Sequence, residues 1–124
     1  SLRREPAVPF ALSFERIAKA HVLLNVSPIL SRGMHDRVPA GMANYAVVLT
    51  DENPYLRRTF TDGKELLFYS LEKPDTLCEQ AERTLTDVRL REKIAASAYE
   101  TFEREYTWKR RAEQILAFAE EVEA

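Results

Sequence analysis

The stretch "AVVLTDENPYLRRTF", residues 46–60, decides the fold class. Its first five residues form an unbroken apolar or β-branched run, which is typical of a strand covered on both faces, as in a parallel sheet between helices. A helix start follows, because Asn53 can accept a hydrogen bond at the N-cap and Pro54 fits the first helical position. A covered strand that leads into a helix predicts an α/β fold.

The same alternation continues on both sides of this stretch. The further predicted elements are a helix over 13–20 behind a Ser13 cap, an apolar run over 21–26, a helix over 36–44 behind an Asp36 cap, and an apolar run over 65–69. We therefore predict a three-layer structure, with a short parallel sheet of about three strands flanked by helices. Gly41 lies inside one predicted helix, where close approach of another backbone or a ligand would explain it, as would simple tolerance.

After residue 69 the apolar spacing predicts helices alone, over 74–85, 87–102 and 107–122. Cys78 falls in the first of them and is predicted to be a small buried hydrophobe. Thr107 is the expected cap of the last helix. The stripe that begins at Trp108 has two interpretations: ordinary core, or a surface that another domain covers. Extensive exposure of Trp108 would favour the second.

Composition limits the class of protein. The 124 residues, 45% of them hydrophobic, fit one domain over 1–124. A net charge of −2 gives no field that would collect nucleic acid or an anionic membrane, and no apolar run is long enough to cross a bilayer. One cysteine excludes an internal disulfide, so a cytoplasmic location is expected, and two histidines without a second cysteine predict no metal site.

The segment "GMHDR", residues 33–37, follows the apolar run 21–26 and opens the next helix. It therefore lies at the carboxyl end of a parallel strand, where open α/β sheets bind ligands, and N–H groups at a helix start favour an anion. Arg37 can pair with phosphate oxygens in a bidentate fashion. The alternative is that Asp36 only caps the helix, that Arg37 is a surface or intramolecular salt-bridge partner, and that His35 is an ordinary loop residue.

Five short motifs follow one another along the chain. In order they are a strand ending in "LN", the "HDR" helix start, a strand ending in "LTD", the turn "F-x-DG-K-E", and the closing helix "TW-x-x-RA". This series, over roughly residues 12–118, resembles the C-terminal part of GT-B glycosyltransferases. It is most similar to the spore-maturation-protein-like branch of glycosyl transferases group 1. The resemblance implies that this domain binds a nucleotide-sugar donor, which is a substrate and not a cofactor. A separate N-terminal domain would then bind the acceptor.

Three positions depart from related families. Those families carry two glutamates with seven residues between them, where this chain has Arg32 and Ala40, and a glycine where it has Tyr45. Because these carboxylates are missing, the resemblance implies that other groups bind the donor. These are the backbone N–H groups of Gly33, Met34 and His35 and the side chains of His35, Asp36 and Arg37. The alternative function is a catalytically degenerate glycosyltransferase-like module with a structural or protein-binding role.

The resemblance also predicts that the chain is a partial donor domain. About six parallel strands are expected, against three candidates here, and the other half carries a basic residue that meets the donor diphosphate. We therefore expect the fragment alone to be inactive and its run 21–26 to be an edge strand. That edge would pair with a second copy, making a homo-oligomer, or be covered by "PAVPFAL", residues 6–12. The nucleotide, the sugar, the acceptor and the stereochemical course stay open.

Overall fold

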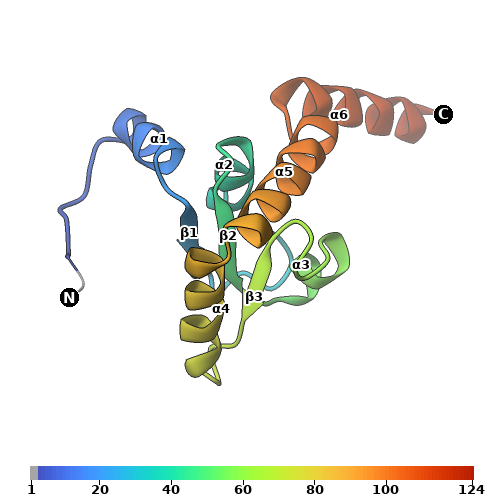
Figure 1. Ribbon diagram of the computed structural model, residues 1–124. Helices are drawn as coiled ribbons and strands as arrows, with labels where there is room; N and C mark the ends of the chain where they lie inside the picture. Colours follow the sequence, from blue (N-terminus) through green and yellow to red (C-terminus); the bar gives the residue numbers. More distant parts are fainter. Residues whose placement is uncertain (1–2) are drawn as a thin grey trace.

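A three-stranded parallel sheet forms the centre of the computed structural model, which describes residues 3–124 (Figure 1). The strands β1 (Val22–Asn25), β2 (Val47–Asp51) and β3 (Leu67–Tyr69) lie in the order β1-β2-β3. All five residues of the central strand β2 are buried, as its continuous apolar run predicted. The predicted α/β class with a short parallel sheet is confirmed.

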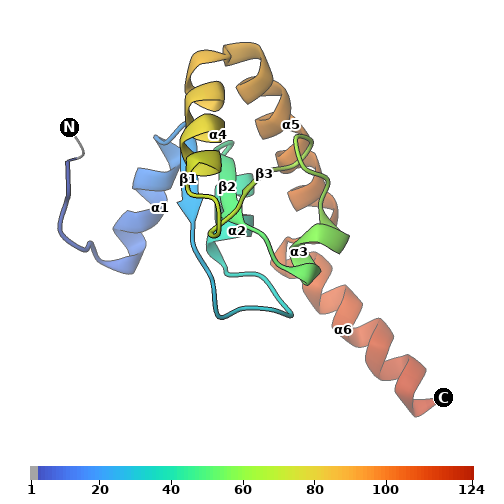
Figure 2. The same cartoon turned by 90° about the horizontal axis from the view of Figure 1, so that it is seen from below.

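Six helices surround the sheet. They are α1 (Phe10–Ala18), α2 (Arg37–Ala43), α3 (Pro54–Thr59), α4 (Asp75–Thr86), α5 (Val88–Glu105) and α6 (Trp108–Glu123). In Figure 2 the sheet lies between α4 on one side and α2 and α3 on the other. Side chains alternate along the strands, so Val48 packs with the α2–α3 layer while Val47 and Leu49 pack with the α4 side.

Helix α5 joins the two layers. Ile94 and Ala95 in its first half pack on the α4 side of the sheet, whereas Ala98 is buried with the α2–α3 layer. Helix α2 is the element that α5 contacts most, and Phe102 packs against the same core. The predicted three-layer arrangement is therefore confirmed, with one helix crossing between the layers.

Of the four predicted helix caps, those of α3 and α6 are confirmed, the one at Ser13 is wrong, and Asp36 is described with the site below. Asn53 accepts from the Leu56 N–H at 2.8 Å, and Thr107 accepts from the Arg110 N–H at 3.1 Å. Helix α1, however, begins at Phe10, directly after Pro9, so Ser13 lies inside the helix and its hydroxyl donates to the Phe10 carbonyl. The physical reason is that a serine hydroxyl can bond back to a carbonyl of the preceding turn instead of capping.

Gly41 is explained by helix–sheet packing. A Cβ at this position would lie 2.6 Å from Val48 Cγ2 and 2.9 Å from Leu23 Cδ2. The close neighbours are thus side chains of the strands and not another backbone. Helix α2 approaches β1 and β2 closely only because residue 41 has no side chain.

Tyr45, at the position where the resemblance predicts glycine, has a backbone φ of 56°. That left-handed conformation costs an ordinary residue roughly 1–2 kcal/mol, whereas glycine adopts it without strain. The Tyr45 ring stacks on the Tyr99 ring with 4.3 Å between the centroids. An aromatic pair contributes about 0.5–1.5 kcal/mol, so the stack offsets much of the backbone strain.

This balance predicts a coupled effect on stability. In a Tyr99→Ala background, Tyr45→Gly should raise the free energy of unfolding by about 1 kcal/mol, because the strain is relieved and no stack is lost. In the natural chain the same change should alter it by less than about 0.5 kcal/mol, because the two terms nearly cancel. Urea unfolding of the four chains measures both steps. Equal effects in the two backgrounds would contradict the proposed compensation.

Cys78 is exposed, so its prediction as a buried residue is wrong. Helix α4 turns Leu77 and Ala81 toward the sheet, and Cys78 lies one position away on the outer side.

Among residues 3–124, no helix is both long and apolar enough to cross a membrane.

Strand β1 lies at the edge of the sheet, as predicted. The segment 6–12 does not cover this edge, because its second half begins α1, which contacts α2. Leu24 therefore stays 48% exposed on the edge strand. Of the two predicted ways to protect the edge, pairing with a second copy of the chain is the one that the fold leaves open.

Helix α6 projects from the body of the molecule and buries none of its residues (Figure 1). Trp108 is 90% exposed, and Ile115 and Phe118 are also exposed. The interpretation of this stripe as ordinary core is wrong. Exposure of Trp108 is the outcome that favours a surface for another domain.

Candidate functional site

Polar residues gather where the three strands end. Asn25 ends β1, Thr50 and Asp51 end β2, and Tyr69 ends β3, all on the carboxyl edge of the sheet. Asn25 and Thr50 are completely buried and Asp51 is nearly so. Buried polar groups of this kind need partners, and here they find them in one another.

Asn25 is the centre of this network. Its Nδ2 donates to Thr50 Oγ1 at 3.0 Å, and its Oδ1 accepts from Arg37 Nε at 2.9 Å and from Ser27 Oγ at 3.3 Å. Its backbone carbonyl accepts from the Tyr69 hydroxyl at 2.8 Å. One side chain therefore links β2, the start of α2 and the loop after β1.

Asp51 and Tyr69 make the remaining contacts at the carboxyl ends of the strands. Asp51 Oδ1 accepts from the Ser27 N–H at 2.9 Å, which fastens the beginning of the loop after β1. Burial raises the pKa of the Tyr69 phenol, and the nearby Asp51 carboxylate raises it further. The phenol therefore keeps its proton and remains the donor to Asn25 near neutral pH.

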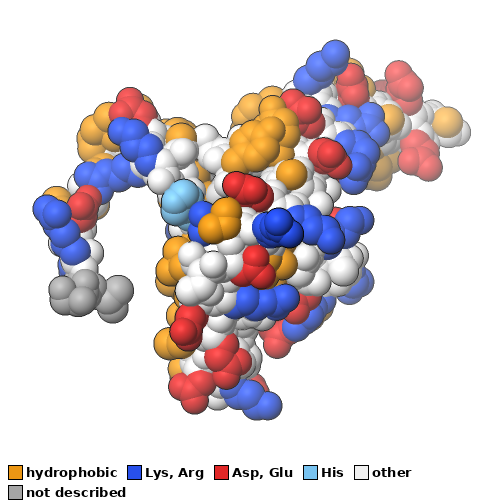
Figure 3. All heavy atoms as spheres, in the orientation of Figure 1, with side chains coloured by type: hydrophobic (Ala, Val, Ile, Leu, Met, Phe, Trp, Pro, Cys, Tyr) orange, Lys and Arg blue, Asp and Glu red, His pale blue; other side chains and the backbone are white. Residues whose placement is uncertain are grey.

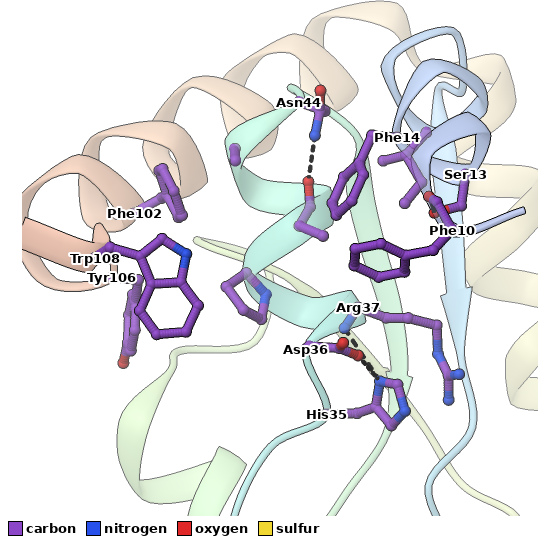
Figure 4. A pocket seen from close by; sticks show the side chains of 14 residues that line it. Phe10, Ser13, Phe14, His35, Asp36, Arg37, Asn44, Phe102, Tyr106 and Trp108 are labelled. Carbon is purple, nitrogen blue, oxygen red and sulfur yellow. Dashed lines mark hydrogen bonds and ion pairs between the residues drawn. The ribbon is translucent and has the colours of Figure 1, made fainter. Parts of the chain in front are cut away.

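Arg37 points from the start of α2 toward the end of β1 (Figure 4). Besides the bond to Asn25, its Nη2 donates to the Val26 carbonyl at 3.2 Å. The Nε–Nη2 edge of the guanidinium could bind a phosphate in a bidentate fashion, but here it donates to Asn25 and Val26. Nη1 makes no hydrogen bond within residues 3–124, so its N–H groups remain available to a ligand.

The helix start at α2 differs from the prediction. Asp36 occupies the N-cap position with helical backbone angles, and its side chain caps nothing. The hydrogen bond that caps the helix is accepted instead by His35, whose Nδ1 lies 3.1 Å from the donating Arg37 nitrogen. The capping role assigned to Asp36 is therefore wrong, because its backbone already turns as in a helix and directs the carboxylate away from the N–H groups.

The same His35 nitrogen also lies 2.5 Å from Asp36 Oδ1. An unprotonated Nδ1 can accept from the Arg37 N–H, whereas a protonated Nδ1 can only donate, in this case to Asp36. The two contacts therefore belong to different proton positions on the ring. Figure 4 shows both partners on the same side of the imidazole.

Because His35 and not Asp36 caps α2, alanine variants at these two positions should differ in stability. His35→Ala should lower the free energy of unfolding by about 0.5–2 kcal/mol, because the cap of α2 is lost. Asp36→Ala should change it by less than about 0.5 kcal/mol, because the carboxylate is exposed and caps no N–H group. Urea unfolding at neutral pH compares the two, and a larger cost for Asp36→Ala would contradict the assignment of the cap.

The remaining predicted site residues lie in the loop between β1 and α2. Asn53 Nδ2 donates to the carbonyls of Gly33 and Leu30, and the Met34 side chain packs against the core. Within residues 3–124, the backbone N–H groups of Gly33, Met34 and His35 donate no hydrogen bond. The loop is thus fixed by its carbonyls and side chains, and its donors stay free.

The structure brings His35, Asp36 and Arg37 together and adds residues that sequence reasoning had not placed in the site: Asn25, Ser27, Asp51 and Asn53. The "LN" and "LTD" strand ends were the signal that could have found two of them. Arg32 is exposed, and Ala40 lies one turn into α2. Neither residue type carries a carboxylate. Among residues 3–124, no group of three His, Cys, Asp or Glu side chains is arranged to hold a metal ion.

Comparison with known families adds the decisive observation. A family model described as glycosyl transferase-like matches residues 2–117, which is nearly the whole chain. The chain belongs to the glycosyl transferase-like family. No curated protein matches it. In this glycosyl transferase-like chain the "LN", "HDR" and "LTD" motifs meet in one hydrogen-bond network, while the more specific branch stays a prediction.

Proposed function

We propose that the chain is the C-terminal, donor-binding portion of a glycosyltransferase that transfers a sugar from a nucleotide-sugar to an acceptor. In that transfer the bond from the anomeric carbon to the diphosphate oxygen breaks, and its electron pair leaves with the nucleoside diphosphate. The acceptor oxygen bonds to the same carbon, and its proton passes to a base. The observation that carries the proposal is the family match over residues 2–117.

Residues 33–37 are the proposed contact with the donor. Three features support this: the loop lies at the carboxyl ends of the strands, the N–H groups of Gly33, Met34 and His35 donate no hydrogen bond within residues 3–124, and Arg37 Nη1 donates none there either. Such groups stabilise the negative charge that develops on a departing diphosphate. The network around Asn25 holds the loop in place before the ligand arrives, which lowers the entropic cost of binding.

A second domain is part of the proposal. In this proposal, further strands of the donor domain pair with the free edge of β1, and an acceptor-binding domain covers the exposed face of α6. The chain alone would then bind the donor without completing the transfer. Its one cysteine permits no internal disulfide, which fits the reducing cytoplasm.

Binding of nucleoside diphosphates with uracil, guanine or adenine bases tests the proposal. We expect one of them to shift the amide NMR signals of residues 33–37. His35→Ala should weaken that binding at least about tenfold, because a hydrogen bond to a charged group contributes roughly 1.5–3 kcal/mol. His21→Ala is the matched control, since His21 precedes β1 at the opposite end of the strand. Failure of all three ligands, or equal effects of the two variants, would count against the proposal.

The degenerate module is the second candidate, and Arg32 and Ala40 favour it because the usual carboxylates are missing. It predicts that no nucleotide binds while a partner domain still does. The titration described above therefore separates the two functions.

A further inference from the structure

One ring nitrogen of His35 has two possible partners. Its Nδ1 lies 3.1 Å from the Arg37 backbone nitrogen, whose N–H requires an acceptor, and 2.5 Å from Asp36 Oδ1, which requires a donor (Figure 4). The nitrogen cannot accept and donate at the same time. Two states of the loop follow. In the first, the ring is neutral and caps α2; in the second, it is protonated and pairs with Asp36, and the Arg37 N–H is released.

Solvent reaches both members of this pair. The His35 side chain is 37% exposed and the Asp36 side chain is 75% exposed. Because Asp36 caps no N–H group of α2, its carboxylate can turn toward the ring or away from it. An imidazole ordinarily gains or loses its proton between about pH 5 and 8. The exchange of partners therefore requires no rearrangement of buried groups.

The charged groups around His35 include both signs. Asp36 and Arg37 line the same hollow as His35, and Asp36 carries the opposite charge to an imidazolium, whereas Arg37 carries the same charge. The Arg37 guanidinium is held at the end of β1 by its bonds to Asn25 and Val26. Asp51, at the end of β2, uses its carboxylate to accept from a backbone N–H of the loop after β1.

The helices around this hollow contribute no further charge to it. Helix α1 lines it with apolar side chains and Ser13, and the α5–α6 junction lines it with aromatic rings, among them Tyr106. Burial raises the pKa of the Tyr106 phenol, so that group stays uncharged near neutral pH. Acidic and basic side chains are interspersed over the face seen in Figure 3, and the net charge is −2. The immediate partners of His35 therefore decide where its proton lies.

We propose that protonation of His35 switches residues 33–37 from a capped to an uncapped state, and that the uncapped state binds the donor more tightly. The effect on the donor rests on the proposed function, whereas the switch itself does not. The protonated ring adds a positive charge, and the released Arg37 N–H is a further donor. Both changes favour a diphosphate, because hydrogen bonds to charged groups are the stronger ones.

The ligand-free chain tests the switch directly. NMR between about pH 5 and 8.5 follows the His35 ring protons and the Arg37 amide together, and we expect both to change with one midpoint. In His35→Asn the side-chain oxygen replaces Nδ1 as the acceptor and does not titrate, so the Arg37 amide should stay constant. In Asp36→Asn the partner of the protonated ring is lost, so the midpoint should move to lower pH.

His21→Asn is the matched control for His35→Asn. His21 precedes β1, at the opposite end of the strand from residues 33–37. The substitution removes the other histidine of the chain and should leave the transition of the Arg37 amide unchanged.

Nucleoside diphosphate titrations at the two ends of this range test the effect on the donor. The terminal phosphate of the ligand also gains a proton in this range, and the same series on His35→Asn measures that contribution by itself. Relative to His35→Asn, the natural chain should gain at least about fivefold in affinity between about pH 8 and about pH 5.5, because a charged group makes the stronger hydrogen bond. His21→Asn should keep this gain.

An Arg37 amide that does not follow the His35 ring, or that still titrates in His35→Asn, would overturn the switch. An equal pH dependence of affinity in the natural chain and in His35→Asn would overturn its effect on the donor. If no nucleoside diphosphate binds, the proposed function fails, and the titration of the ligand-free chain still decides the switch.

Discussion

Asn25→Leu should lower the free energy of unfolding by about 2–4 kcal/mol, the largest effect that we expect from a single substitution here. Leucine is similar in size, so little packing is lost. The substitution leaves Arg37 Nε and the Ser27 hydroxyl without an acceptor and Thr50 Oγ1 without a donor. Each group that loses its partner in a buried site costs about 1–3 kcal/mol. Urea unfolding followed by circular dichroism measures the loss.

Asn44→Leu is the matched control for Asn25→Leu. Asn44 Nδ2 makes a single bond, 2.8 Å long, to the Ala40 carbonyl near the end of α2, where water can replace it. We expect a cost under about 1 kcal/mol. Comparable costs at both positions would show that the network around Asn25 contributes nothing beyond an ordinary hydrogen bond. The amide signals of residues 33–37 should also shift in Asn25→Leu and not in Asn44→Leu, because only Asn25 connects to that loop.

Gly41→Val should lower the free energy of unfolding by about 1–3 kcal/mol, the usual cost of adding methyl groups to a packed core. Val48 is β-branched and fully buried, so its Cγ2 cannot rotate away easily from a side chain 2.6 Å distant. Helix α2 would have to move outward from β1 and β2. Thermal and urea unfolding both report this change.

Gly33→Val is the control for Gly41→Val, because a Cβ at Gly33 meets no atom within 4 Å. We expect its effect on unfolding to stay within about 0.5 kcal/mol. Adding Val48→Ala to the Gly41 variant should recover part of the loss, because the clashing methyl is removed. If the two glycine variants are equally stable, close packing of α2 on the sheet does not explain Gly41.

The sequence by itself determined the class of fold and the approximate bounds of most elements. Unbroken apolar runs marked strands that are covered on both faces, and the Asn53–Pro54 pair marked the start of α3. These signals are local, because strand burial and helix capping depend on residues close together in the chain. The ordered motifs also indicated the family, which the match over residues 2–117 confirmed.

The tertiary structure decided what those residues do. Asn25, Arg37 and Asp51 lie far apart in the sequence, and only the parallel pairing of β1 with β2 brings them to one edge. Sequence patterns placed a ligand loop there, but they could not show that half of the Arg37 guanidinium is bound to Asn25 and Val26. Likewise the choice between His35 and Asp36 as the cap depends on backbone angles at residue 36, which the surrounding packing sets. Exposure of Cys78 and Trp108 follows from the same cause, since helical spacing defines a face and only the packing of the whole chain decides whether anything covers it.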